Sequence, residues 1–348
     1  MELPHQGLWP GIAISAALAL IAMQIGAIDW LAAHGISPLT AAIMLGIVIG
    51  NTFYARFAAT AGAGVSFSRQ TLLRAGVILY GFRLTVHDVG HVGFAGIVID
   101  ALVLSTTFVL TVSLGVRVFR LDRRTAILIG AGSSICGAAA VMATEPVVQA
   151  KAEQVTMAIS TVVVFGTAAI FVYPALYALS SHGAAPIQPQ AFGVYAGSTI
   201  HEVAQVFAAG RSVSQEVANT AVIAKMVRVM MLAPFLIILS AWLGPRSRRR
   251  VPDHGNASIH VPWFAVGFIA AVVFNSLALL PTWLVRGVIS FDTFLLAMAM
   301  AALGMTTHLS AVRDAGPKPL LLGGVIFVWL IVGGAAINWS VVTLLAPR

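Results

Sequence analysis

The sequence predicts an all-α, polytopic membrane protein, and three observations carry that prediction. Of the 348 residues, 59% are hydrophobic and only 9% are charged, whereas soluble domains average about 25% charged residues. The apolar residues form blocks of about 20, the length of helix that crosses a bilayer. Basic residues gather between alternate blocks, as they do in the cytoplasmic loops of membrane proteins. We therefore expect one transmembrane transporter domain over residues 1–348 and no soluble domain.

The chain contains eleven apolar blocks that we interpret as transmembrane helices. They cover residues 8–29, 37–54, 71–88, 92–116, 125–149, 155–179, 191–210, 216–243, 261–283, 291–310 and 319–345. The first ten residues, MELPHQGLWP, lack the basic region of a cleaved signal peptide, so we expect the first span to remain. Cys136 is the only cysteine, which excludes a disulfide within one chain.

The basic residues predict the orientation of the chain. Thirteen of the 20 Lys and Arg lie in or beside the second, fourth, eighth and tenth loops, and only four lie on the opposite side. By the positive-inside rule the N-terminus is cytoplasmic, and because eleven is odd the C-terminus is on the other side. The net charge of +8 is therefore a topology signal. We expect the lipid bilayer as a partner and no nucleic acid.

Two parts of the chain share a pattern that suggests an internal repeat. Gly46 to Thr52 (GIVIGNT) matches Gly193 to Thr199 (GVYAGST) at a distance of 147 positions. Five spans per repeat is an odd number, so two repeats insert in opposite senses, which is the plan of many secondary transporters. We predict a 5+5 inverted repeat over residues 37–180 and 190–348, with residues 1–36 as an extra N-terminal helix. The alternative is that Gly-x-x-x-Gly marks only helix packing.

Two stretches of small and polar residues lie within apolar spans. Residues 130–141 read GAGSSICGAAAV and residues 197–210 read GSTIHEVAQVFAAG. Aligning Gly132 with Gly197 gives Gly-Ser-(Ser/Thr)-Ile-x-x-x-Ala-x-Val-x-Ala in both, at a spacing of 65. Irregular backbone survives at membrane depth only where protein or a wet cavity satisfies it. We predict a broken helix at each stretch; a continuous helix with a small-residue face is the alternative.

The first stretch contains a candidate anion site. Gly130 and Gly132 can end one half-helix, and Ser133 or Ser134 can cap the next. The free N–H groups at the start of that second half-helix would then bind an anion. The residues that we assign to substrate binding are Ser133, Ser134, Ile135, Gly137, Ser198, Thr199, Lys225 and Arg228.

Ionisable side chains follow the second Gly-Ser pair. His201 and Glu202 lie at membrane depth, where charged groups are costly and mark function by default. Gln205 lies four residues after His201, on the same helix face. We assign coupling roles to these three residues, because a histidine or a buried carboxyl group can exchange protons. A neutral histidine and a hydrogen-bonded glutamate that join two helices are the alternative.

Lys225 and Arg228 lie three residues apart on one face of the eighth span. Apolar residues flank them on both sides, so these cations need a negative partner. That partner is a substrate anion or a carboxylate, and a structural ion pair of Arg228 with Glu202 is the alternative. The carboxylates available within the spans are Glu202, Glu145 and Asp100.

Further residues are weaker candidates for the site: Arg83, Glu145 and His308. Arg83 is the counterpart of Arg228 in the repeat and can also reach lipid headgroups, while Glu145 can line the cavity or lie at a membrane edge. The segment at residues 304–308, GMTTH, can form another broken helix. His87 and His91 have metal-ligand spacing without a third ligand, so we expect surface histidines and no metal.

The sequence gives little sign of an enzyme. A triad of Ser133, His201 and Glu202 can be drawn, but the chain has no Gly-x-Ser-x-Gly nucleophile motif. It also has no Gly-x-x-x-x-Gly-Lys-(Ser/Thr) motif for nucleotide binding. We therefore expect no enzymatic activity, no cofactor, and transport driven by ion gradients.

Three blocks carry a resemblance to a known family. GAGSSICGAAAV, GSTIHEVAQVFAAG and AKMVRVMMLAP (residues 224–234) resemble the hallmark blocks of the YeiH-type sulfate exporter family of bacterial inner-membrane proteins, and the resemblance covers nearly the whole chain. It implies a secondary carrier of the bile-acid-symporter-like superfamily, with one broken, crossing helix per repeat, in spans five and ten. Met226 and Val227 stand where the resemblance leads us to expect leucine and threonine.

We therefore expect a secondary transporter of the bacterial inner membrane, with its C-terminus in the periplasm. It would move a small inorganic oxyanion, sulfate- or sulfite-like, by alternating access, with H⁺ or Na⁺ as the coupling ion. A homo-oligomer is compatible with the sequence. The alternatives are a sodium-coupled symporter of an organic anion, an anion channel, and a structural or sensory membrane protein.

Overall fold

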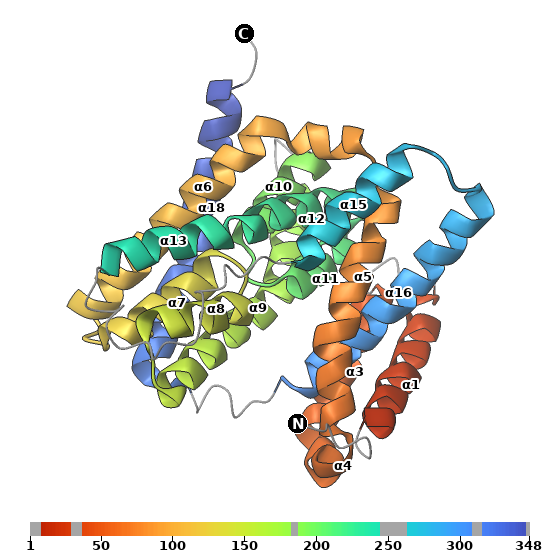
Figure 1. Cartoon of the computed structure of the whole chain (residues 1–348), viewed down its shortest axis with the longest axis horizontal. Coiled ribbons are helices and arrows are strands. Elements are labelled where there is room, and N and C mark those ends of the chain that lie inside the picture. Colours follow the sequence, from red (N-terminus) through yellow and green to blue (C-terminus); the bar gives the residue numbers. More distant parts are fainter. Residues whose placement is uncertain (1–7, 29–36, 182–186, 244–262, 308–314, 346–348) are drawn as a thin grey trace. The chain divides into compact units, whose positions relative to one another are not determined.

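A computed structural model describes residues 8–28, 37–181, 187–243, 263–307 and 315–345. The regular structure of these residues is entirely helical (Figure 1). Six of the described helices are long and apolar enough to cross a membrane. The chain divides into two compact units: unit 1 comprises Met1–His91, Ala208–Asn219 and Trp263–Leu309, and unit 2 comprises Val92–Phe207, Thr220–Pro262 and Ser310–Arg348.

Unit 1 contains helices from both ends of the sequence. They are α1 (Leu8–Gly26), α3 (Pro38–Thr52), α4 (Tyr54–Phe67), the π-helix η2 (Ser68–Leu72), α5 (Leu73–Tyr80), the 3-10 turn η3 (Gly81–Arg83), α15 (Trp263–Ser276) and α16 (Thr282–Met305). Helix α16 packs against α1, α3 and α5, and α1 packs against α3 and α4 (Figure 1).

Glycines allow the helices of unit 1 to approach closely. A Cβ atom on Gly64 of α4 would overlap the backbone of Leu8 and Gly11 in α1. A Cβ atom on Gly46 of α3 would likewise overlap the backbone of Ala301 and Gly304 in α16. Small residues at such crossings are typical of packed membrane helices. The Gly-x-x-x-Gly pattern that suggested a repeat therefore contributes to packing here.

One predicted loop is helical. The interval between the second and third predicted spans, residues 55–70, contains three basic residues in or beside it and was expected to be a loop; instead α4 and η2 fill it. The physical reason is its small-residue composition, AATAGAG (residues 58–64), which lets α4 lie directly against α1. The prediction of a loop followed from the basic residues of this interval and did not take its small residues into account.

Unit 2 contains the broken helices. Its elements are α6 (Val86–Arg117), α7 (Arg123–Ser134), α8 (Ala138–Val148), α9 (Ala152–Ser181), α10 (Pro189–Thr199), α11 (Val203–Val213), α12 (Gln215–Met230), α13 (Leu232–Leu243) and α18 (Pro317–Leu345). Three of them, α6, α11 and α12, begin or end in unit 1. Helix α9 packs against α7, α8 and α18, and α10 packs against α18.

Most predicted spans overlap one helix or two consecutive helices, but the third covers α5, η3 and parts of η2 and α6, and α16 begins nine residues before the tenth. The fourth span, for example, corresponds to α6, and the sixth corresponds to α9. Both units combine segments from the first and second predicted repeats. The number of eleven spans, the inverted repeat and the orientation of the termini stay predictions.

Candidate functional site

The first Gly-Ser stretch is a broken helix, as predicted. Helix α7 ends at Ser134, and α8 begins at Ala138. Between them the chain turns at Gly137, whose φ of 71° is readily adopted by glycine. The Gly137 N–H donates to the main-chain oxygen of Gly132 over 2.9 Å, which closes the end of α7.

The break lies later in the sequence than predicted. Gly130 and Gly132 do not end a helix: they lie inside α7, where they face Phe108 and Val141 respectively. Ser133 and Ser134 form the last turn of α7 rather than the cap of α8. The α8 N-cap is Gly137, which has no side chain to cap the helix.

The second Gly-Ser stretch is also a broken helix. Helix α10 ends at Thr199 and α11 begins at Val203, with Ile200, His201 and Glu202 between them. The Glu202 N–H donates to Oε1 of Gln205 over 3.0 Å, and this side chain thereby caps the start of α11. The second break therefore lies in the seventh span.

The tenth span, which the resemblance paired with the fifth, differs from expectation. Helix α16 is unbroken from Thr282 to Met305, and Gly304 is a packing contact to α3. The hydroxyl of Thr307 donates to the main-chain oxygen of Leu303 over 2.8 Å, and His308 lies outside the described residues. In the described part of this span the break that we predicted is absent, because its glycine serves the α3–α16 crossing.

Lys225 holds the two breaks together. Its ammonium group donates to the main-chain oxygen of Ile135 over 2.6 Å and to that of Ile200 over 2.7 Å. These two isoleucines are the matching positions of the two motifs. One cation therefore serves the same place in both breaks.

Arg228, one helical turn after Lys225 on α12, also donates hydrogen bonds to main-chain oxygens at the ends of both α7 and α10. Its Nη1 donates to the oxygen of Ser198 over 2.5 Å and its Nη2 to that of Ser133 over 3.1 Å, again matching motif positions. Its Nε donates to the oxygen of Ser134 over 2.6 Å. Arg228 and Lys225 are both fully buried. Cations are favourable at the C-terminal ends of helices, where main-chain oxygens lack partners, so this pair stabilises the ends of α7 and α10.

The hydroxyl groups of Ser198 and Thr199 form hydrogen bonds within α10. The hydroxyls of Ser198 and Thr199 both donate to the main-chain oxygen of Tyr195, over 3.0 and 2.5 Å. Nδ2 of Asn338, on α18, donates to the Ser198 hydroxyl over 3.1 Å. The main-chain oxygens of the serines, and not these hydroxyls, face the cations.

Glu202 lies at the start of α8. Its Oε1 accepts a hydrogen bond from the Ala138 N–H over 3.1 Å. The neighbouring His201 and Gln205 are buried, and neither His201 Nδ1 nor Gln205 Nε2 has a hydrogen-bond partner among the described residues. Of the three residues assigned to coupling, Glu202 therefore contacts the start of α8, the half-helix end to which we had assigned an anion.

Asp100 on α6 is a further member of this centre. Its side chain is fully buried, and neither carboxylate oxygen has a hydrogen-bond partner in the described part of the chain. The charges of Arg228 and Lys225 act on it. Asp100 is thus a carboxyl group near the two basic side chains, one of the three acidic residues that the sequence offered.

The weaker candidates lie elsewhere. Glu145 is half-buried on α8, two turns after Ala138. Arg83 belongs to unit 1, and His87 is exposed.

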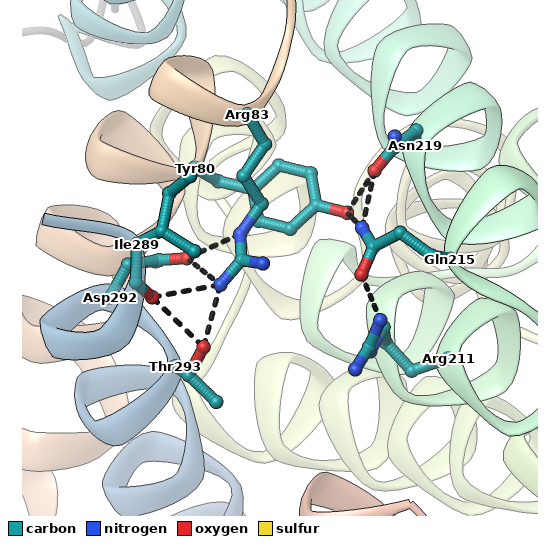
Figure 2. A network of polar contacts seen from close by, with 8 residues as sticks. All are labelled: Tyr80, Arg83, Arg211, Gln215, Asn219, Ile289, Asp292 and Thr293. Carbon is teal, nitrogen blue, oxygen red and sulfur yellow. Dashed lines mark hydrogen bonds and ion pairs between the residues drawn. The ribbon is translucent and has the colours of Figure 1, made fainter. Parts of the chain in front are cut away.

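Arg83 anchors a polar network in unit 1, shown in Figure 2. Its guanidinium pairs with the buried carboxylate of Asp292 on α16 at 3.0 Å. It also donates to the Thr293 hydroxyl over 2.6 Å and to the main-chain oxygen of Ile289 over 2.9 Å. Arg83 therefore has a carboxylate partner within its own unit rather than lipid headgroups alone.

The second half of the network surrounds Tyr80. Its hydroxyl donates to Oδ1 of Asn219 over 2.7 Å and accepts from Nε2 of Gln215 over 3.1 Å. Arg211 in turn donates to Oε1 of Gln215 (Figure 2). Sequence reasoning missed this network except for Arg83. An acidic residue in the apolar run VISFDTFLL (residues 288–296) was the signal that pointed to it.

Comparison with known proteins places the chain among bacterial membrane proteins. A family model described as conserved hypothetical protein 698 matches residues 10–323. A UPF0324 membrane protein of Pseudomonas aeruginosa is 61% identical over 330 residues, covering 94% of this chain and 93% of the relative. The UPF0324 inner membrane protein YeiH of Escherichia coli K12 is 53% identical and covers 99% of both chains.

The YeiH protein of Salmonella typhimurium is 56% identical over 339 residues, covering 97% of this chain and 95% of the relative. The names of these relatives and the six long apolar helices support a multi-pass protein of the inner membrane. The chain belongs to the family described as conserved hypothetical protein 698, which includes the inner membrane protein YeiH.

Proposed function

We propose that this protein is a secondary active transporter that moves a small inorganic oxyanion, such as sulfate or sulfite, across the inner membrane by alternating access. The observation that carries the proposal is the meeting of two broken helices around the buried Lys225 and Arg228. Secondary transporters bind charged solutes at such discontinuous helices, whose backbone is irregular only where it lines a site.

The charges at this centre favour an anion. The N-terminus of α8 is the positive end of a half-helix, and the Glu202 carboxylate already lies against it. Lys225 and Arg228 add two positive charges with no side-chain ion pair in the described residues. The unpartnered Nδ1 of His201 and Nε2 of Gln205 are polar atoms that a bound oxyanion or its water can satisfy.

The same contacts favour protons over sodium as the coupling ion. Main-chain oxygens exposed by a helix break are the groups that coordinate Na⁺ in broken-helix transporters. Here the oxygens of Ile135 and Ile200 accept hydrogen bonds from Lys225, which leaves less room for a second cation. His201 and Glu202 are groups that can exchange protons.

Uptake of radiolabelled sulfate into proteoliposomes tests the proposal. We expect wild-type protein to accumulate sulfate when a proton gradient is imposed. We expect Arg228→Ala and His201→Ala proteins to insert but to lose this transport. Because Arg228→Ala also removes partners of three main-chain oxygens, His201→Ala is the cleaner variant, and Arg117→Ala, at an exposed arginine of unit 2, is the control.

Wild-type transport rates in both site variants would refute these assignments. Transport that requires sodium but no proton gradient would favour a sodium-coupled symporter. Currents far above the turnover of a carrier would identify a channel instead. Absence of uptake of sulfate, sulfite, thiosulfate and small carboxylates would overturn the proposal itself.

A further inference from the structure

The start of α8 holds a carboxylate that comes from the other broken helix. The Ala138 N–H donates to Oε1 of Glu202, which is 64 residues away in the sequence. The α8 N-cap residue, Gly137, supplies no side chain of its own. A negative group at the N-terminus of a helix satisfies free N–H groups and interacts favourably with the helix dipole. Glu202 therefore occupies the place of a bound anion.

The backbone is shaped to admit this carboxylate. A Cβ atom on Gly137 would overlap Cγ and Oε1 of Glu202. The φ of Gly137, 71°, also lies in the region that favours glycine. The space that a side chain would fill at position 137 is thus taken by the Glu202 side chain.

Two buried polar groups without partners in the described part of the chain belong to the same break as Glu202 or to the first turn of α11 after it. His201 is 2% exposed and its Nδ1 has no hydrogen-bond partner among the described residues. The same holds for Nε2 of the fully buried Gln205, whose Oε1 accepts from the Glu202 N–H. Buried polar atoms of this kind normally have a partner, so these two side chains offer unfilled contacts at the second break, the break that contains Glu202.

The Glu202 side chain is partly accessible, as proton exchange with solvent requires. It is half-buried, unlike its neighbours His201 and Gln205. The charged and titratable groups that interact with it are Lys225 on α12 and Cys136 in the first break, and His201 precedes it in the sequence. Of the helices packed against the broken ones, α13 contains no charged residue, α9 contains only Glu153 and α18 only Lys318. Lys225 is thus the basic residue near Glu202 among these elements.

We propose that Glu202 is a tethered competitor of the transported oxyanion. An ionised Glu202 and a substrate anion cannot both accept the Ala138 hydrogen bond, and two negative groups at one helix end repel each other. When Glu202 takes up a proton, its carboxyl group releases Ala138, and a substrate oxygen takes its place. Each anion that binds therefore brings one proton onto Glu202. This inference rests on the proposed function.

The competitor also explains how an empty carrier can change conformation. With no substrate bound, the ionised Glu202 satisfies the α8 N-terminus, so the empty site carries no bare N–H group at Ala138. With substrate and proton bound, the same N–H group is satisfied by the substrate. The intermediate state, a protonated Glu202 without an anion, leaves it unpaired and is disfavoured. Proton and anion therefore move together.

Calorimetric titration of detergent-purified protein with sulfate tests this inference. Sulfate stays a dianion from about pH 5 to about pH 8, the range in which such switches operate, so any proton taken up goes to the protein. Titrations in two buffers of different ionisation enthalpy give the number of protons bound per sulfate. For wild-type protein we expect about one, and an affinity that falls about tenfold per pH unit where Glu202 is ionised.

Three variants make the test specific. Glu202→Gln removes the charge and keeps the shape, so we expect it to bind sulfate at every pH with the affinity of wild type at low pH and without proton uptake. Glu202→Ala, which removes the carboxyl oxygen altogether, should behave likewise. Glu153→Gln, the same change at an exposed glutamate of unit 2, should match wild type at every pH.

The outcomes separate this inference from the proposed function. Sulfate binding that is independent of pH in wild type, or lost in folded Glu202→Gln and Glu202→Ala proteins, overturns the role of Glu202 alone. Absence of anion binding by wild type and by both Glu202 variants overturns the proposed function and this inference together.

Discussion

Nζ of Lys225 lies 2.6 Å from the main-chain oxygen of Ile135, in the break that follows α7. The same nitrogen lies 2.7 Å from the oxygen of Ile200, in the break that follows α10. The two isoleucines occupy the same position of a motif that occurs twice, 65 residues apart. The repetition seen in the sequence thus corresponds to two helix ends that share one cation.

Loss of either buried cation should destabilise the fold. Arg228→Gln removes the donors of three main-chain oxygens and Lys225→Met those of two. An unsatisfied buried acceptor costs about 1–3 kcal/mol, so we expect both variants to unfold at lower temperature, Arg228→Gln the more so. Thermal unfolding in detergent measures this, with exposed Arg117→Gln as the control. Unfolding temperatures equal to that of the control would contradict the assigned contacts.

Gly137→Ala should be costly for two reasons, its positive φ and the overlap with Glu202. A non-glycine residue in such backbone costs roughly 1–3 kcal/mol. Gly287→Ala is a matched change on a helix position with open space around it, where alanine should stabilise by about 0.5–1 kcal/mol. We therefore expect the two variants to shift the unfolding temperature in opposite directions. Shifts of the same sign would argue against the conformation of the first break.

The Arg83–Asp292 pair should show strong coupling. Asp292 is fully buried, and Asp292→Asn leaves Arg83 without its counter-charge. Breaking a buried pair from one side typically costs about 3–5 kcal/mol. We expect the double variant with Arg83→Gln to be less destabilised than the sum of the two single variants, as measured in a thermal double-mutant cycle. Strict additivity would show that the pair contributes nothing as a pair.

Close packing of α1 on α4 depends on Gly64 and on Gly11, which lies opposite it. A Cβ atom at Gly64 meets the backbone of Leu8, which cannot move aside as a side chain can, whereas a Cβ atom at Gly62 meets only the Tyr54 hydroxyl at 3.7 Å. We expect Gly64→Ala to lose about 1–3 kcal/mol from overpacking and Gly62→Ala, like Gly287→Ala, to gain about 0.5–1 kcal/mol. Thermal unfolding of the two proteins in detergent measures the difference. Equal stability would contradict the close contact of α1 with α4.

Part of this architecture could be predicted from the sequence. The helical class, the presence of most of the long apolar helices and both broken helices follow from apolar block length and from the Gly-Ser stretches. The exact position of the first break could not be predicted, because the sequence alone does not distinguish the roles of Gly130, Gly132 and Gly137. Only the third has a positive φ, while the other two face Phe108 and Val141.

Contacts across the fold were harder to foresee. His201 and Glu202 stood out because ionisable groups are costly at membrane depth, but the partner of Glu202 is a main-chain N–H group 64 residues away. Likewise, Lys225 and Arg228 were expected to meet carboxylates or substrate, and they meet main-chain oxygens. Such contacts cannot be predicted from residue types, because nearly every residue carries the same main-chain N–H and C=O groups.

Cys136, the only cysteine of the chain, lies in the first break and is 7% exposed. The natural protein therefore carries a single, uniquely addressable thiol between α7 and α8. A fluorophore or spin label attached there needs no engineered background. Its attachment rate and its signal would follow, in real time, any opening of the gap between the two half-helices.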